Sequence, residues 1–597
     1  MTFAGWLTIV LFAVILTALA LPLGSYMAAV YSGGRVILSP IFAGPERLLY
    51  KLLRVDPTHE QDWKAYAKSL IVFSLVGWLF LYFVLRTQNA PWVPHLLNPL
   101  GYHSAPWNVT FNTVSSFMTN TNWQFYSGET TMTYLSQMIG LTVQNWLSAG
   151  IGIVVAVALV RGIIGRTGKG IGNFWQDLVR TILYVLAPLS VFAAIVLASQ
   201  GVIANFSNYL VVHTITGLTQ TIAMGPVASQ EAIKMLGTNG GGFFNTNSAH
   251  PFENPTQFTN FFEMLLVLII PAALVFMYGR MTSNRRQGYA IYGAMMVMFL
   301  GAVCVAYIAE AHGSPAQHAA GLHTGVISGS GGGNMEGKEQ RFGIAGSALF
   351  DVVTTVTSCG AVNSAIESFT GIGGAVPFAN LSASEVIFGG VGTGLYSILM
   401  YVLLAVFIGG LMVGRTPEWL GKKLEAREIK LAGLGILITP LAALFCTALA
   451  SASKAGRASI SEAATSATLG THTPQAFSET FYAYLSQANN NGSAFAGYTG
   501  FIQPNAGNLG SHGITFADIL GGFDMIFARY APILFALAIA GALAGKRVTP
   551  AGLGTMRTDN PTFVVLLIGV IILVGALTFF PALLLGPIVQ GLTGHLY

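Results

Sequence analysis

The feature that most restricts the fold of this sequence is a series of long apolar segments. Each is long enough to cross a lipid bilayer, which takes roughly 20 residues in a helix. Backbone amides in lipid must be hydrogen-bonded within the protein, so such segments fold as helices. We therefore predict an all-α polytopic membrane protein with about ten transmembrane helices. The segments lie near residues 3–30, 69–86, 134–160, 181–200, 257–279, 288–311, 386–413, 431–453, 515–544 and 561–587.

The composition excludes a soluble protein. Only 9% of the 597 residues are charged and 53% are hydrophobic, whereas soluble domains carry about 25% charged residues. The three cysteines, Cys304, Cys359 and Cys446, are far apart and form no Cys-x-x-Cys pair. This spacing argues against a disulfide framework and against a zinc site.

The basic residues predict how the chain is oriented in the membrane. Most of the 28 lysine and arginine residues fall in five segments, 31–68, 161–180, 280–287, 414–430 and 545–560. These alternate with four longer segments, 87–133, 201–256, 312–385 and 454–514. By the positive-inside rule, the basic loops are cytoplasmic, and the four longer segments and both termini are outside. The net charge is +5, but the basic residues lie in loops between apolar spans. This distribution indicates a lipid bilayer as the partner and not a nucleic acid.

The four outer segments share one pattern, which indicates an internal repeat. Each contains a short helix-like run, then a cluster of small polar residues and glycines, then the next apolar span. The clusters align on Asn122, Gly240, Gly360 and Gly492, at a spacing of roughly 120 residues. We expect four pore repeats, 69–161, 177–280, 288–414 and 430–545, with an extra transmembrane helix at each end, 1–31 and 561–597.

Each repeated run is too short to cross the membrane, so it must enter and return. Extended backbone cannot face lipid and must line a cavity filled by water or ions. Four such loops around one axis present a ring of carbonyl oxygens, which can replace the hydration shell of K⁺. The alternative is four ordinary outer turns, in which Gly and Asn are common. The candidate filter residues are Asn120, Thr121, Asn122, Gln124, Thr238, Asn239, Gly240, Ser358, Cys359, Gly360, Asn490, Asn491 and Gly492.

Two further features lie in the apolar spans. Arg529 is central in 515–544, where an arginine costs about 2.5–3.5 kcal/mol on insertion scales. It therefore faces the pore or a polar partner such as Asp524. A glycine-rich stretch follows Glu385 and weakens the next helix; it forms a gate or lateral opening, or it permits close helix packing. Its glycines are Gly389, Gly390, Gly392 and Gly394.

Several stretches resemble one known family, the KdpA potassium-translocating subunits of bacterial Kdp P-type ATPases. The matching stretches are 119–124, 236–248, 334–343, 414–418 and 490–497, and the resemblance covers essentially the whole chain. It implies a bacterial inner-membrane protein, related to channel-like K⁺ transporters, in complex with the ATP-hydrolysing subunit KdpB and the small subunits KdpC and KdpF. It also implies that K⁺ enters through the filter and leaves sideways into KdpB, with Arg529 below the filter as a barrier and the glycine-rich stretch as a gate.

The sequence argues against ATP chemistry in this chain. No Asp-Lys-Thr-Gly phosphorylation motif occurs, and the Walker-like run 332–338 is followed by Glu339 where Mg²⁺ binding needs Ser or Thr. We expect K⁺ as the substrate and no nucleotide or organic cofactor. His312, His318 and His323 are expected in an outer loop and not at a metal site. The alternative function is a self-sufficient K⁺ channel or symporter; a polytopic enzyme would need a cluster of catalytic side chains that the sequence does not show.

Overall fold

A computed structural model describes residues 1–588 apart from 167, 169, 327–331, 413, 415–416, 464–475, 496–497, 499–511 and 551–554. Some predicted features lie outside the described residues. These are the basic residues Lys169 and Arg415, much of the fourth outer segment, and residues 589–597 of the C-terminal unit.

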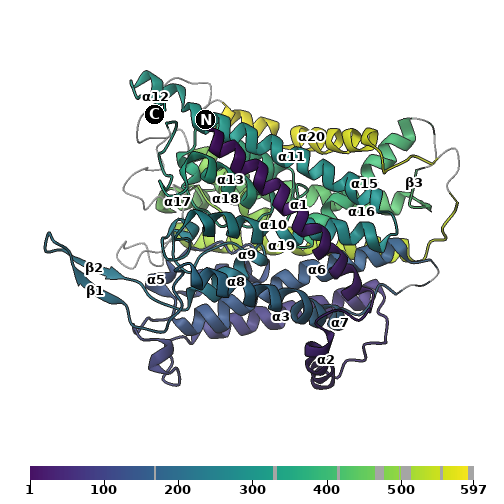
Figure 1. Cartoon of the computed structure of the whole chain (residues 1–597), viewed down its shortest axis with the longest axis horizontal. Helices are drawn as coiled ribbons and strands as arrows, with labels where there is room; N and C mark the ends of the chain where they lie inside the picture. Colours follow the sequence, from purple (N-terminus) through teal and green to yellow (C-terminus); the bar gives the residue numbers. More distant parts are fainter. Residues whose placement is uncertain are drawn as a thin grey trace.

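The described residues confirm the predicted all-α membrane architecture, because ten helices are long and apolar enough to cross a bilayer. They lie side by side along the long axis of the molecule (Figure 1). The spans are α1 (Phe3–Tyr31), α3 (Trp63–Arg86), η2–α6 (Ser136–Thr142 and Val143–Ile164), α7–η3–α8 (Phe174–Arg180, Thr181–Leu186 and Ala187–Ser199), α10 (Gln257–Met281), α11 (Arg285–His312), α15 (Thr393–Met412), α16 (Ala426–Ala452), α19 (His512–Ala544) and α20 (Pro561–Leu583).

Four short helices lie at one end of this bundle and precede the four predicted loops. They are α4 (Trp107–Met118), α9 (Val227–Leu236), α13 (Gly343–Val356) and α18 (Ala476–Ala488). The remaining elements are α2 (Ser39–Leu53), η1 (His95–Leu97), α5 (Gly128–Thr131), η4 (Asn247–Ala249), α12 (Pro315–Ala319), η5 (Ile366–Ser368), α14 (Gly371–Ser382), α17 (Lys454–Ala463), η6 (Leu584–Ile588), the hairpin of β1 (Leu210–His213) and β2 (Thr219–Ile222), and the pair β3 (Glu418–Trp419) and β4 (Lys422–Lys423).

Several span boundaries differ from the sequence prediction. Two helices begin earlier because a side chain caps their first turn: Asp62 accepts a hydrogen bond from the Ala65 amide at 2.8 Å, and Asn173 caps α7. The span predicted at 386–413 begins later, with α15 at Thr393. Residues 383–392 are not helical, since Phe388 and Gly389 among them have positive φ, which a right-handed helix does not permit.

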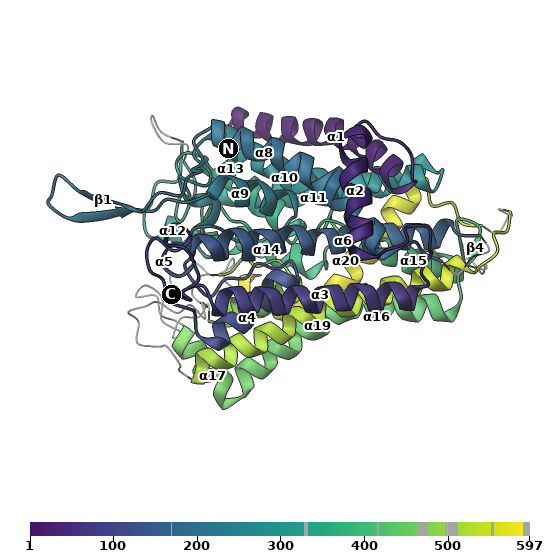
Figure 2. The same cartoon turned by 90° about the horizontal axis from the view of Figure 1, so that it is seen from below.

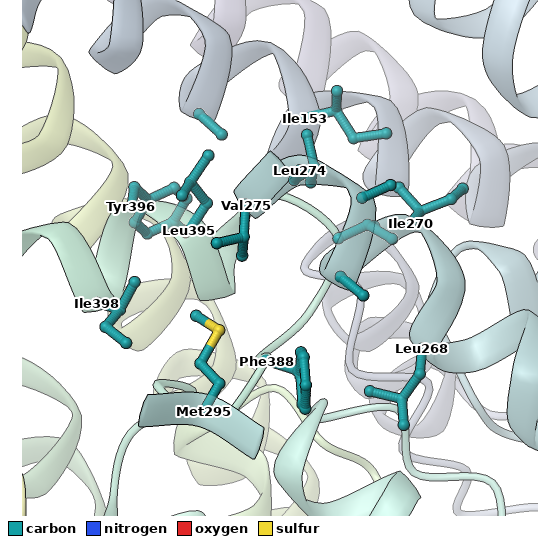
Figure 3. Packing of buried hydrophobic residues seen from close by; sticks show 14 of the residues in the cluster. Ile153, Leu268, Ile270, Leu274, Val275, Met295, Phe388, Leu395, Tyr396 and Ile398 are labelled. Atoms are coloured by element: carbon teal, nitrogen blue, oxygen red, sulfur yellow. The ribbon is translucent and has the colours of Figure 1, made fainter. Parts of the chain in front are cut away.

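The core of the bundle is formed by α6 and α10, whose apolar spans are largely buried. Figure 3 shows Ile153 of α6, Leu274 of α10 and Tyr396 of α15 among the buried side chains of this core. In contrast, only 28% of the residues in the apolar stretches of α1, α3 and α20 are buried. A helix that is apolar on all sides suits either a core or lipid, so the exposed apolar surfaces of these three helices are suited to contact with lipid.

The predicted basic segments lie together at one end of the bundle. Ion pairs connect some of them there: Arg180 with Glu46 at 2.8 Å, and Lys546 with Glu428 at 2.6 Å. The short helices α4, α9 and α13 and the β1–β2 hairpin lie toward the opposite end (Figure 2). The charge pattern of the sequence therefore corresponds to two distinct ends of the folded molecule.

Candidate ion filter

The four predicted loops have the same local backbone geometry. Each short helix ends four residues before the aligned residue of its loop. In each loop, the amide just before the aligned residue donates to the carbonyl five residues earlier. These bonds run from Thr121 to Ser116 (2.9 Å), from Asn239 to Lys234 (2.8 Å), from Cys359 to Thr354 (2.9 Å) and from Asn491 to Ser486 (2.9 Å). The four loops therefore share one hydrogen-bonded backbone turn.

Each loop also places positive φ at the same two positions, separated by one residue. The pairs are Asn120 and Asn122, Thr238 and Gly240, Ser358 and Gly360, and Asn490 and Gly492. For Thr238 and Ser358 this conformation is strained, at a cost of about 1–3 kcal/mol each. Strain of this kind persists where the surrounding structure fixes the backbone, and it is common at ligand-binding sites.

The glycines show that the four loops surround one axis. A Cβ atom on Gly240 would overlap the carbonyl oxygen of Cys359 in the third loop. In the same way, a Cβ atom on Gly360 would overlap the carbonyl of Asn491 in the fourth loop. One on Gly492 would overlap the carbonyl of Thr121 in the first loop. Each loop therefore contacts the next one around the ring, and glycine is required at these three contacts.

The ring is closed between the first and second loops by side-chain amides. Asn122 occupies the aligned position in the first loop, and its Nδ2 donates to the Gly240 carbonyl at 2.8 Å and to Asn145 Oδ1 at 3.0 Å. Gln124 makes two hydrogen bonds with the backbone of Gly242, at 2.9 and 3.0 Å. The first loop has Asn122 where the other three loops have glycine. Its contact with the second loop is therefore made by the side-chain amides of Asn122 and Gln124.

The side chain six residues before the aligned residue supports the loop differently in different repeats. Thr354 Oγ1 accepts a hydrogen bond from the Gly360 amide at 2.8 Å, and Ser486 Oγ accepts one from the Gly492 amide at 3.1 Å. In the second repeat this position is Lys234, whose Nζ donates to the Gly241 carbonyl at 2.8 Å. Lys234 is buried.

Lys234 belongs to a buried charged cluster that the sequence analysis did not identify. Its ammonium lies 2.7 Å from the Glu231 carboxylate and 2.8 Å from that of Glu253. Glu253 also accepts a hydrogen bond from the Phe244 amide at 2.7 Å. A signal was present in the sequence, because Lys234 and Glu231 are charged residues in a predicted pore loop, where a buried charge needs a partner.

The glycine-rich stretch lies below the ring. Thr238 Oγ1 accepts a hydrogen bond from the Val391 amide at 3.0 Å, and Glu385 accepts one from the Gly390 amide at 3.2 Å. A Cβ atom on Gly392 would overlap the carbonyl of Gly152 in α6. The helix is therefore broken here, and the same stretch packs closely against a neighbouring helix.

Arg529 lies next to this stretch and is buried. Its Nη1 donates to Thr393 Oγ1 at 2.7 Å. The predicted alternative, a pair with Asp524, is not present in the described residues, where both Asp524 carboxylate oxygens lack a hydrogen-bond partner. A cavity lined by Asn490, Glu385 and Arg529 connects the fourth loop with this arginine.

The Walker-like run has a structural role. Lys338 Nζ pairs with Glu310 at 2.7 Å and lies 4.0 Å from the ring centroid of Phe369. Burial lowers the pKa of the Lys338 ammonium, against the opposing effect of the Glu310 carboxylate. His312 and His318 bind backbone carbonyls, and no group of three metal-ligating side chains occurs in the part of the chain that the structure describes.

Known proteins resemble this chain over nearly its whole length. The family model described as "Potassium-transporting ATPase A subunit" matches residues 10–592. A "Potassium-transporting ATPase potassium-binding subunit" of Mesorhizobium japonicum is 50% identical over 592 residues, covering 99% of each chain. One of Granulibacter bethesdensis with the same description is 50% identical over 600 residues, covering 100% of each. The crystal structure of the potassium transporter TrkH from Vibrio parahaemolyticus aligns with a TM-score of 0.49 at 14% identity, covering 90% of this chain and 98% of that one.

Proposed function

Because this chain belongs to the family of potassium-transporting ATPase A subunits, we propose that it selects and binds K⁺ for an ATP-driven uptake complex. The observation that carries this proposal is the closed ring of four loops, in which each loop contacts the next through the aligned residues. A ring of this kind can surround one cation with backbone oxygens. The predicted set from Asn120 to Gly492 would form the filter.

Two physical effects favour a monovalent cation in this ring. The four short helices end just before the ring, and the C-terminal end of a helix carries a partial negative charge. Carbonyl oxygens can replace the water shell of K⁺. Since K⁺ would be the substrate, the filter must both bind and release it. Uncharged backbone oxygens suit this role because they bind the ion without holding it too tightly.

The proposed path below the filter turns sideways. A buried arginine repels a cation strongly where the dielectric constant is low, so Arg529 would disfavour a direct exit along the pore axis. The non-helical residues 383–392 lie beside the cavity that reaches Arg529. They would form the lateral opening toward the ATP-hydrolysing subunit. We expect that subunit to be KdpB, with KdpC and KdpF in the same inner-membrane complex and the basic end of this chain in the cytoplasm.

ATP hydrolysis would take place in the partner subunit. Lys338, the lysine of the Walker-like run, is buried against Glu310 and Phe369 and is not free to bind a phosphate. The chain itself would be non-catalytic and would set the ion dependence of its partner's reaction. The alternative, a self-sufficient channel or symporter, predicts K⁺ flux without ATP.

The test is K⁺-stimulated ATP hydrolysis by the complex that co-purifies with this chain. Gly240→Ala should lower the apparent K⁺ affinity or admit Na⁺ and Rb⁺, because its Cβ would overlap the Cys359 carbonyl. Gly301→Ala is the matched control, since a Cβ atom there meets nothing within 4 Å. An unchanged K⁺ affinity and ion preference in Gly240→Ala would contradict the filter assignment. K⁺ uptake by the chain alone, without ATP, would support the alternative.

The barrier role of Arg529 has its own test. Arg529→Ala should allow passive K⁺ leak through reconstituted complexes, or should make ATP hydrolysis independent of K⁺. The measurement is K⁺ efflux from vesicles together with the K⁺ dependence of hydrolysis. If both remain as in the unmodified complex, the arginine serves only to hold Thr393.

A further inference from the structure

The basic end of α10 and α11 carries a hollow that the ion path does not use. It has a volume of about 740 Å³ and lies between the ends of α1, α10 and α11. Three arginines line it, Arg280, Arg285 and Arg286, together with Ser32 and Asn284. No carboxylate is among its described lining residues.

The three arginines are available to a ligand. All three are exposed, and none forms an ion pair with a described carboxylate. Arg285 is also the first residue of α11, so the positive end of that helix lies at the same place. Asn284 caps this helix by accepting a hydrogen bond from the Gln287 amide at 3.1 Å. The hollow thus combines three guanidinium groups with a helix N-terminus and selects for a negative charge.

A second and much smaller hollow, of about 20 Å³, adjoins the first. It is lined by Leu21, Phe276 and Tyr289, and it shares Arg280 and Arg285 with the basic hollow. Phe276 precedes Arg280 by four residues and Tyr289 follows Arg285 by four, so these side chains lie about one helical turn, roughly 5 Å, further into the span. Tyr289 is 52% exposed, as expected for an aromatic residue at a membrane interface.

We infer that the basic hollow binds the headgroup of one anionic glycerophospholipid from the leaflet at the basic end of the bundle. The arginines would hold its phosphate, and its acyl chains would lie in the bilayer against the exposed ring of Tyr289. Arginine is suited to this role because its planar guanidinium can donate two hydrogen bonds to one phosphate. A free phosphate would fill the basic hollow but would gain nothing from the exposed apolar surface of Tyr289, which favours a lipid over a soluble anion.

The close packing of the three helices makes the site rigid. A Cβ atom on Gly24 of α1 would lie 2.7 Å from Phe276 Cβ of α10, and one on Gly279 of α10 would lie 3.1 Å from the Gly288 Cα of α11. The walls of both hollows are therefore fixed relative to one another. A lipid bound here would contact all three helices at once.

The test measures lipid binding to the purified complex by native mass spectrometry, with phosphatidylglycerol and phosphatidylcholine as probes. Juxtamembrane basic residues each strengthen binding to anionic lipid by roughly fivefold. The triple variant Arg280→Gln, Arg285→Gln, Arg286→Gln should therefore bind phosphatidylglycerol on the order of 100-fold more weakly. The matched control is Lys423→Gln, Arg427→Gln, Lys430→Gln, which removes the same charge from exposed residues of the same end and should not weaken binding.

Two further arms identify the source of the phosphate and guard against misfolding. Tyr289→Ala keeps every charge and should still weaken phosphatidylglycerol binding, and the single variant Arg286→Gln should weaken it by roughly fivefold. Equal affinity for phosphatidylcholine, displacement of the lipid by millimolar inorganic phosphate, or unchanged binding in both the triple variant and Tyr289→Ala would each overturn the inference.

Discussion

The second and third pore loops have the same backbone but hold it by different means. In the third loop, the neutral hydroxyl of Thr354 accepts a hydrogen bond from the Gly360 amide. In the second loop, the ammonium of Lys234 donates to the Gly241 carbonyl and is balanced by two carboxylates. A hydroxyl supports one backbone group at small cost, whereas a buried charge is stable only while all of its partners remain. The fourfold symmetry of the ring therefore belongs to the backbone and not to the side chains behind it.

The largest expected effect comes from removing the charge in the second loop. Lys234→Met would leave the carboxylates of Glu231 and Glu253 without their cation and the Gly241 carbonyl without a donor. Breaking a buried ion pair by removing one partner costs about 3–5 kcal/mol. We expect a large fall in the thermal unfolding temperature of the complex and loss of ATP hydrolysis at low K⁺.

The matched control for this variant is Lys423→Met, because Lys423 is exposed. Lys234→Arg keeps the charge and should retain more stability than Lys234→Met. If Lys234→Met unfolds at the same temperature as the control, the charged cluster does not support the second loop.

A smaller effect is expected in the third loop. Thr354→Val keeps the shape of the side chain but leaves the buried Gly360 amide without its acceptor, at a cost of about 1–3 kcal/mol. Loss of this hydrogen bond should distort the third loop and so weaken K⁺ binding. The apparent K⁺ affinity should fall by roughly tenfold for each 1.4 kcal/mol by which the K⁺-bound state is destabilised. The measurement is a K⁺ titration of ATP hydrolysis.

The control for the third loop is Thr578→Val, since Thr578 donates only to the Val574 carbonyl of its own helix, at 2.7 Å. An effect of Thr354→Val as large as that of Lys234→Met would remove the distinction between the two kinds of support.

The smallest effect is expected in the first loop. Ser116 occupies the position equivalent to Lys234 and Thr354, but its Oγ has no hydrogen-bond partner among the described residues. Ser116→Ala should therefore change stability by about 0.5 kcal/mol or less. The measurements are the stability of the complex against denaturant and the K⁺ dependence of its ATP hydrolysis. A loss comparable to that of Thr354→Val would mean that the first loop depends on this hydroxyl after all.

The sequence predicts the long helices and the repeated loops because each depends on a local pattern. Apolar length fixes the spans, and the aligned Asn122, Gly240 and Gly360 reflect a backbone with positive φ. The non-helical residues 383–392 before α15 and the cluster around Lys234 depend instead on contacts between distant segments. Glu253 lies 19 residues from Lys234, and Val391 lies 153 residues from Thr238, so no local pattern reveals either contact.

The central claim is that one cation is bound on the axis of the four loops. The most direct measurement is the anomalous scattering of Rb⁺ or Tl⁺, used as substitutes for K⁺, in crystals of the purified complex. We predict a peak on the axis enclosed by Thr121, Asn239, Cys359 and Asn491, which competing K⁺ removes and Na⁺ at the same concentration does not. A map with no peak there, or a peak that Na⁺ displaces equally well, would contradict the account.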